Sequence, residues 1–237
     1  MKLLIDIGNS RIKICFFSGN EFWKVMEVDS TYEIKNSEFI SSTKKCLLSA
    51  SGNEEEWTHF LETEQIPYII FNSKLNLPVN IKYKTPESLG NDRLAGVCGA
   101  KVLFPHKNVL VIDAGTAITY DILTGKGDYI GGNISPGLSM RYKSLNTFTK
   151  RLPLLNFRES VIEIGNSTEE AIHKGVQYGI IAEMFAYINE WKRKLKDLKI
   201  VITGGDACFF ENSLKSNIFV VPNLVLFGLK SILELNE

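Results

Sequence analysis

The chain has no excess of charge of either sign, few cysteines and no long apolar run. Its 27 Lys and Arg residues balance its 27 Asp and Glu residues, so the formal net charge is zero. A nucleic-acid-binding protein usually carries a basic excess, so the composition argues against that class. The basic run at 192–196 is most simply the solvated end of a helix. No apolar stretch reaches the length of a membrane-spanning helix, so we expect no membrane association.

Two further absences exclude familiar kinds of site. The four cysteines form no CxxC pair, so neither a zinc site of that spacing nor a thioredoxin-like motif is supported. No GxxxxGK[ST] segment is present, which excludes a P-loop mechanism. The first residues resemble a strand rather than a signal sequence. We therefore expect a soluble cytoplasmic protein with buried free thiols at Cys15, Cys46, Cys98 and Cys208.

The most informative feature present is a glycine-containing acidic turn that occurs twice. The segments LLIDIGNSRIK (3–13) and VLVIDAGTAITYD (109–121) both place an Asp, a small or apolar residue and a Gly between two β-rich runs. Glycine lets a ligand approach the backbone closely, and the amides and the Asn9 or Thr116 side chain can bind phosphate oxygens. The carboxylate suits a hydrated cation instead. One copy could be ordinary turn chemistry, but two copies with matching flanks favour a phosphate-and-cation site.

Apolar periodicity predicts two halves with a similar order of elements. Gly19-Asn20 and Thr124-Gly125 are turn signals, and Ser167 with Glu170 fits a capping box. Expected strands lie at 2–6, 11–17, 21–28, 46–50, 68–71, 109–113, 117–123, 127–132, 199–203 and 218–221. Expected helices lie near 31–41, 53–64, 90–104, 137–148 and 168–196, with a short helix before the last strand and a closing helix from Pro222. The repetition predicts a duplicated α/β fold with domains 1–108 and 109–237 and a cleft between them.

The order of the motifs carries a resemblance over nearly the whole chain. The two turns follow DxGNxxxK and DAGTAxTxD, patterns shared with a wide superfamily of acetate and sugar kinases, Hsp70 and actin. Between and after them come GxDR, GGxIxPG, TxxA and TGGD. With these, the chain resembles the type III pantothenate kinases. The six motifs occupy Asp6–Lys13, Gly90–Arg93, Asp113–Asp121, Gly131–Gly137, Thr168–Ala171 and Thr203–Asp206.

The resemblance implies a fold and an activity. The fold is a pair of ribonuclease H-like (actin-like ATPase) domains with a nucleotide cleft between them. The activity is transfer of the ATP γ-phosphate to the primary hydroxyl of pantothenate, giving 4'-phosphopantothenate, the first step of coenzyme A biosynthesis. The family implies magnesium, a monovalent cation (potassium or ammonium) and a homodimer with the pantothenate site near its interface. Apolar helix faces could serve that interface or pack within the domain, around Ile172, Ile180, Met184 and Ile188.

The resemblance also implies roles for individual residues. Asp92 would be the general base and Arg93 would hold the pantothenate carboxylate, although a capping Asp and a surface Arg are the plain alternatives. Asp113 would bind the monovalent cation and Asp6 magnesium, through water. ATP would contact Asp6, Ile7, Gly8, Asn9, Ser10, Arg11, Ile12, Lys13, Thr116, Gly204 and Gly205. Pantothenate would contact Tyr83, Gly90, Asn91, Asp92, Arg93 and Thr168.

Two other functions keep part of this pattern. A sugar or acetate kinase of the same superfamily would retain the turns at Asp6 and Asp113 but would not need the GNDR segment at 90–93. A weakly active nucleotide-binding regulatory protein would keep the fold without turnover. The intact Asp92, Arg93 and Thr168 argue against the regulatory protein.

Overall fold

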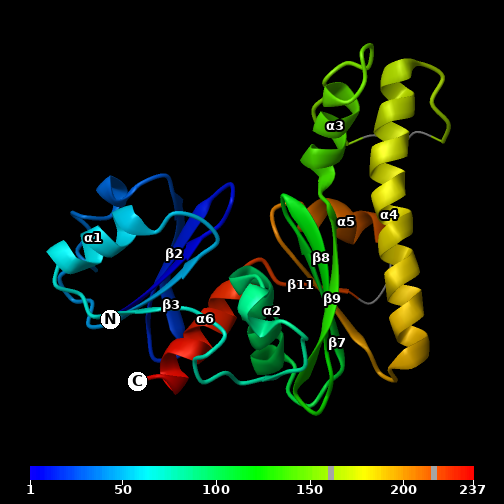
Figure 1. Ribbon diagram of the computed structural model, residues 1–237. Coiled ribbons are helices and arrows are strands. Elements are labelled where there is room, and N and C mark those ends of the chain that lie inside the picture. The colour runs from blue at the N-terminus through cyan, green and yellow to red at the C-terminus, as the bar shows by residue number, and fades with distance from the viewer. Residues whose placement is uncertain (160–162, 215–217) are drawn as a thin grey trace. The chain divides into compact units, whose positions relative to one another are not determined.

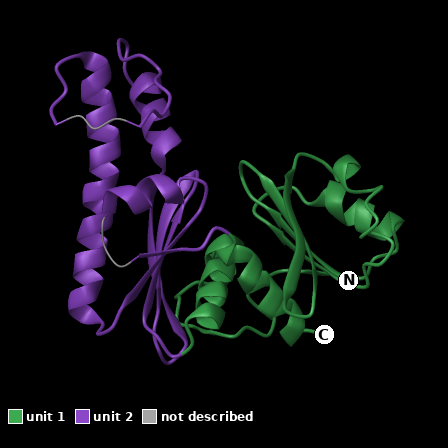
Figure 2. Ribbon diagram, turned by 180° about the vertical axis from the view of Figure 1, so that it is seen from behind, with its two compact units in different colours: residues 1–105, 223–237 green, residues 106–222 purple. Residues whose placement is uncertain are grey.

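The computed structural model describes residues 1–159, 163–214 and 218–237, and it forms two compact units. Unit 1 comprises Met1–Pro105 together with Asn223–Glu237, and unit 2 comprises His106–Pro222 (Figure 2). The division near residue 106 lies close to the boundary expected after 108. The last helix differs from the expectation, because it belongs to unit 1 and not to the second half.

Unit 1 is built on a five-stranded sheet in the order β3-β2-β1-β4-β5. The first three strands are antiparallel, and β4 and β5 run parallel to β1. One face carries a core of residues such as Ile5, Phe16, Leu48 and Trp57. The elements of unit 1 are β1 (Lys2–Ile7), β2 (Ile12–Ser18), β3 (Glu21–Val28), β4 (Cys46–Ala50), α1 (Glu55–Thr63), β5 (Tyr68–Ile70), β6 (Asn80–Ile81), α2 (Asn91–Leu103) and α6 (Leu224–Leu235), with 3-10 turns η1 (Thr31–Glu33) and η2 (Pro86–Ser88).

Unit 2 repeats this topology. Its strands follow the order β9-β8-β7-β10-β11, with β7, β8 and β9 antiparallel and with β10 and β11 parallel to β7. The sheet packs against the long helix α4 and the short helix α5 (Figure 1). The elements of unit 2 are β7 (Val109–Ala114), β8 (Ala117–Leu123), β9 (Asp128–Pro136), α3 (Leu138–Thr147), α4 (Thr168–Lys194), β10 (Lys199–Thr203), α5 (Ala207–Leu214) and β11 (Ile218–Val220). The duplicated α/β fold predicted from the repeated turn is therefore confirmed.

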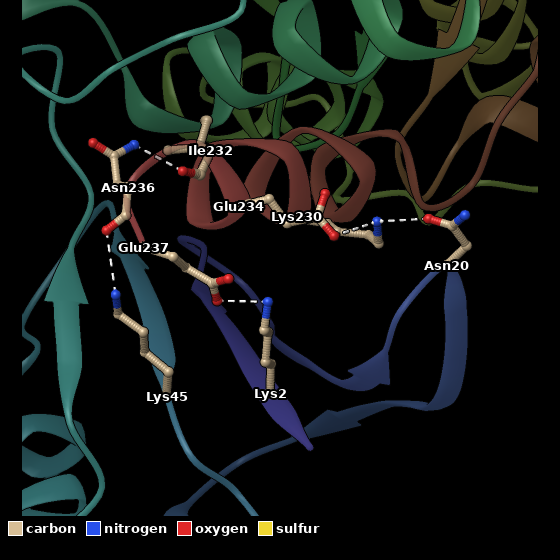
Figure 3. Close-up of polar contacts among 8 residues, drawn as sticks. All are labelled: Lys2, Asn20, Lys45, Lys230, Ile232, Glu234, Asn236 and Glu237. Carbon is tan, nitrogen blue, oxygen red and sulfur yellow. Dashed lines mark hydrogen bonds and ion pairs between the residues drawn. The ribbon is translucent and has the colours of Figure 1, made fainter.

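Helix α6 belongs to unit 1 because it crosses α2 at backbone contact. A Cβ atom on Gly228 would lie 1.8 Å from the carbonyl oxygen of Ala95, so only glycine fits there. Figure 3 shows polar contacts that hold the same helix: Lys2 of β1 pairs with Glu237, and Lys45 donates to the carbonyl of Asn236 at 3.2 Å. Such long-range contacts leave no signature in local sequence periodicity.

Three local expectations are corrected by the structure. The segment 31–41 forms only the short 3-10 turn η1, and beyond it hydroxyl groups bond to nearby carbonyls, as Thr43 does to Phe39 at 2.7 Å. Such local bonds compete with a helix. Cys208 is exposed, whereas the other three cysteines are buried as expected. At the start of α4, Glu170 N–H donates to Ser167 Oγ at 3.3 Å, but the Glu170 carboxylate accepts from Asn166 N–H, so the capping box is half formed.

The apolar residues of α4 are also assigned by the structure. Ile172, Ile180, Met184 and Ile188 are all buried in the core of unit 2. They pack within the unit, and the interface alternative for them is excluded. Among the described residues, no helix is long and apolar enough to cross a membrane.

Candidate active site

The first acidic turn joins β1 to β2. Gly8 N–H donates to the carbonyl of Arg11 at 3.0 Å, so this amide closes the turn. The Arg11 guanidinium lies against the Glu27 carboxylate, with Nη1 and Oε2 3.0 Å apart. Arg11 therefore contributes its backbone to the turn while its side chain pairs on the surface. Asn9 and Ser10 at the tip are exposed, which suits contact with a ligand.

Asp6 lies at the carboxyl end of β1, among groups of both signs. Ser49 Oγ donates to Asp6 Oδ1 at 3.1 Å, and Lys13 is its cross-strand neighbour on β2. Burial raises the pKa of Asp6 to about 6; the Ser49 hydrogen bond lowers that pKa, the charge of Asp92 raises it, and Lys13 lowers it. The charge of Asp92 thus acts directly on the first turn. A partly buried carboxylate beside a second carboxylate is a favourable ligand for a divalent cation.

Asp92 lies in the first turn of α2, whose start is tied to the sheet. The Asn91 amide donates to the carbonyls of Ala50 and Phe71, at 3.3 and 3.2 Å. These carbonyls stand at the carboxyl ends of β4 and β5, so Asn91 fixes the start of α2 beside the end of the sheet. In the structure, the Asn91 side-chain amide therefore holds the start of α2 in place.

The Asp92 carboxylate folds back toward Gly90. Gly90 is the N-cap of α2, so Asp92 is not the capping residue, although its Oδ1 accepts from the Arg93 N–H at 2.8 Å. A Cβ atom at position 90 would lie 2.6 Å from Asp92 Oδ1. Glycine at this position therefore leaves room for the carboxylate.

Arg93 and Tyr83 are brought together. The guanidinium carbon of Arg93 lies 5.6 Å from the centre of the Tyr83 ring, a cation–π contact. Only 7% of Arg93 is exposed, which excludes the simple surface arginine. The family resemblance assigns each of the two residues to pantothenate separately, and the structure adds a direct contact between them. A buried, stacked guanidinium is well prepared to bind a carboxylate in two-pronged fashion.

The second acidic turn joins β7 to β8 in unit 2, and three of the sequence motifs meet there. Gly115 N–H donates to the Ala117 carbonyl at 3.1 Å, and Gly137 N–H, from the GGNISPG segment, donates to the Thr116 carbonyl at 3.0 Å. Asp206 N–H, from TGGD, donates to the Ala114 carbonyl at 3.0 Å. The motifs at 131–137 and 203–206 therefore support the turn from two sides.

Gly204 brings its backbone against the acid of that turn. Its φ is +94°, a conformation that favours glycine, and a Cβ there would lie 2.5 Å from Asp113 Oδ1. Thr116 and Gly205 are exposed, which suits contact with a ligand. Thr168 is also exposed, at the first position of α4, where Ser167 is the N-cap.

Two polar residues at these turns had no assigned role in the sequence-based prediction. Ser49 binds Asp6, and Thr119 is buried opposite Asp113. The sequence signal for Thr119 was its place in the second copy of the turn. Strand register shows that this place corresponds to that of Lys13 in the first copy.

Comparisons with known proteins agree on one family. The model for the family "Type III pantothenate kinase" matches residues 2–190. A type III pantothenate kinase of Bacteroides fragilis (strain YCH46) is 41% identical over 241 residues, covering 100% of this chain and 99% of the relative. The one from Flavobacterium johnsoniae is 39% identical over 233 residues, covering 97% of this chain and 96% of the relative.

Solved structures of low identity share the fold. A Campylobacter jejuni protein described as a "conserved putative Baf family transcriptional activator" has a TM-score of 0.66 at 22% identity, with 98% of this chain and 97% of that chain covered. MreB5 of Spiroplasma citri bound to ADP has a TM-score of 0.52 at 11% identity, with 98% and 95% covered. These likenesses show the actin-like fold. With the family match over most of the sequence and 41% identity over its full length, the chain belongs to the type III pantothenate kinase family.

Proposed function

We propose that this protein transfers the γ-phosphate of ATP to the primary hydroxyl of pantothenate, giving 4'-phosphopantothenate in the cytoplasm as the first step of coenzyme A biosynthesis. The observation that carries the proposal lies in unit 1. Asn91 ties the start of α2, which carries Asp92, to the end of β4, and β4 is paired with β1, which carries Asp6 in the first acidic turn. A base for an alcohol and a ligand for cation-bound phosphates are thus held by one rigid set of strand and helix ends.

Asp92 is the general base of this reaction. Its carboxylate accepts the proton of the pantothenate hydroxyl while that oxygen attacks the γ-phosphorus, and the bond from the γ-phosphorus to the ADP oxygen breaks. Gly90 leaves room for the carboxylate, and Asn91 holds the start of α2 in place. Asn91 is therefore a positioning residue as well as a neighbour of the substrate.

Arg93 binds the pantothenate carboxylate. Its guanidinium is buried and stacked on Tyr83, so little further ordering is needed when the carboxylate arrives. Thr168 adds a hydroxyl contact to pantothenate from the start of α4. A planar fork that binds both carboxylate oxygens selects an acid substrate over a neutral sugar.

The two acidic turns bind the phosphates of ATP. In the first turn, the backbone from Ile7 to Ile12 and the ammonium of Lys13 contact phosphate oxygens, while Asp6 holds magnesium through water. When bound there, magnesium would supply positive charge that neutralises the phosphate oxygens. In the second, Thr116 contacts phosphate and Gly204 and Gly205 approach the adenosine. Asp113 binds a monovalent cation, potassium or ammonium.

The enzyme acts as a homodimer in this proposal. Several large apolar side chains of unit 2 are exposed and could be covered by a second copy of the chain. They include Phe148, which directly follows α3, and Tyr178 and Phe185 of α4. Light scattering coupled to gel filtration measures the mass. A species of twice 26.7 kDa supports the homodimer, and a single chain at micromolar concentration contradicts it.

A substrate panel tests the proposed activity. ADP release is measured with pantothenate, acetate and hexoses as acceptors, at fixed ATP, magnesium and potassium. We expect turnover with pantothenate alone. Robust hexose or acetate turnover without pantothenate turnover would identify another kinase of the superfamily, and ATP binding without turnover on any acceptor would favour a regulatory role.

A further inference from the structure

The repeated fold provides an internal reference for the second acidic turn. In unit 1, Asp6 of β1 is paired with Lys13 of β2 on one side and with Ser49 of β4 on the other. The Ser49 hydroxyl donates to the carboxylate, and the Lys13 charge acts on it. We call Ser49, Asp6 and Lys13 the first row. The Asp6 carboxylate therefore has two neighbours, the hydroxyl of Ser49 and the side-chain ammonium of Lys13.

Unit 2 has a corresponding row with one change of chemistry. Asp113 of β7 is paired with Thr119 of β8 on one side and with Thr203 of β10 on the other. We call Thr203, Asp113 and Thr119 the second row. The position that carries the ammonium of Lys13 in the first row carries a neutral hydroxyl, that of Thr119, in the second.

The side chains of the second row share one face of the sheet. Residues adjacent to them along the strands, Ile112, Ile118, Tyr120 and Ile202, belong to the core that packs against α4 and α5. Successive side chains of a strand point to opposite faces, so the second row lies on the face away from that core. Cβ atoms of directly opposite residues in an antiparallel pair are about 5 Å apart, which brings Thr119 and Asp113 within reach of one ion.

The Thr119 hydroxyl has no hydrogen-bond partner among the described residues. Thr119 is 7% exposed, and its Oγ1 is the buried side-chain oxygen or nitrogen that lacks a hydrogen bond among the residues described in the structure. Buried hydroxyls in native proteins are nearly always paired, and an exception indicates a bound water or ion. A hydroxyl oxygen with two lone pairs is also a suitable ligand for a cation that prefers oxygen.

We propose that Thr119 Oγ1 is a ligand of the monovalent cation at Asp113, and that this exchangeable cation takes the place that the Lys13 ammonium has in the first row. The inference deepens the proposed function, in which Asp113 binds potassium or ammonium. The carboxylate is held against the backbone of Gly204, which fixes one side of the site. Thr119 then supplies a neutral oxygen from the neighbouring strand.

Cation binding is measured without substrate, so that the result does not depend on catalysis. Thermal unfolding of the full chain is followed while potassium chloride replaces choline chloride at constant ionic strength, with no nucleotide and no pantothenate. A cation that binds the folded state raises the unfolding temperature in a concentration-dependent way. We expect this potassium-specific rise for the unaltered protein. No such rise would overturn the proposal even if pantothenate were phosphorylated.

Two substitutions separate the hydroxyl from the shape of the side chain. Thr119→Val keeps the branched shape and removes the oxygen, so the potassium concentration for half of the effect should rise by about tenfold or more, the loss expected for one contact to a charge. Thr119→Ser keeps the oxygen and should bind close to normally. An unchanged potassium midpoint in Thr119→Val, or equal loss in both variants, would contradict a role for the hydroxyl.

The comparison between the rows makes a stronger prediction. Thr119→Lys places an ammonium where the first row has one, so the folded protein should no longer be stabilised by potassium. In the ADP-release assay, its activity should become independent of potassium. A Thr119→Lys protein that still requires potassium with the normal midpoint would show that the cation binds elsewhere.

Discussion

Asp6→Asn should make the protein more stable while it weakens nucleotide binding. In the folded protein, the pKa of Asp6 is about 6 instead of 3.8, chiefly because the ionised carboxylate is buried, with a contribution from Asp92. At neutral pH the folded state must therefore hold an unfavourable charge. The difference of about two pKa units corresponds to at most about 3 kcal/mol at about 1.4 kcal/mol per unit. Asn removes the charge and can still accept the hydrogen bond from Ser49.

The sign of the pH dependence follows from the raised pKa. Below the unfolded pKa of 3.8, Asp6 is protonated in both states and has no effect on their balance. As the pH rises toward about 6, the unfolded state loses its proton first, so the free energy of unfolding falls. Above pH 6 or so, Asp6 is ionised in both states and the free energy of unfolding falls no further on its account. The stability gained by Asp6→Asn should therefore be about 1–3 kcal/mol at pH 8 and roughly half of that at pH 5.

Urea unfolding at pH 5 and pH 8 measures this gain, with the exposed Asp29→Asn as a matched control that removes a carboxylate from a surface position. Calorimetric titration with magnesium and ATP should show weaker binding for Asp6→Asn and normal binding for the control. A gain in stability that is absent at pH 8, or that is equal at both pH values, would refute the account of Asp6 as a carboxylate whose pKa is raised by burial.

Two further substitutions test the acceptor side of the site. Gly90→Ala places a methyl group 2.6 Å from Asp92 Oδ1, so the carboxylate must move, and kcat should fall by about 10²-fold, as expected for a base displaced by about 1 Å. The circular dichroism spectrum and the ATP affinity should be normal. An unchanged kcat would mean that the position of the carboxylate is not critical. Arg93→Lys keeps the positive charge but loses the forked geometry, so the KM for pantothenate should rise by about tenfold or more while the KM for ATP is unchanged; equal changes in both KM values would indicate a general structural defect.

Much of the fold was predictable because it depends on local patterns. The strands around the two acidic turns show clear apolar runs, and the duplicated order of elements follows from them. The expected helix at 31–41 was wrong because side-chain hydroxyl groups in and just after this segment donate to nearby carbonyls, and these hydrogen bonds compete with those of a helix. The place of α6 in unit 1 depends on contact between Gly228 and Ala95, which are far apart in the sequence.

The candidate site was predictable in its residue types but not in its electrostatics. The family pattern indicated Asp6 and Asp92, but nothing in the sequence showed that the charge of Asp92 raises the pKa of Asp6. The correspondence between Lys13 and Thr119 also required the strand register, because the two turns differ by one residue in length. Such relations arise only when separate strands are aligned in a sheet.

The most direct test of the central claim is the turnover of Asp92→Asn. Asn keeps the size of the side chain but cannot accept the hydroxyl proton, so pantothenate-dependent ADP release should fall by about 10²–10⁴-fold, the usual effect of losing a general base. Calorimetric ATP titration of the same variant should remain close to normal. A near-normal kcat for Asp92→Asn would contradict the account and place the base elsewhere.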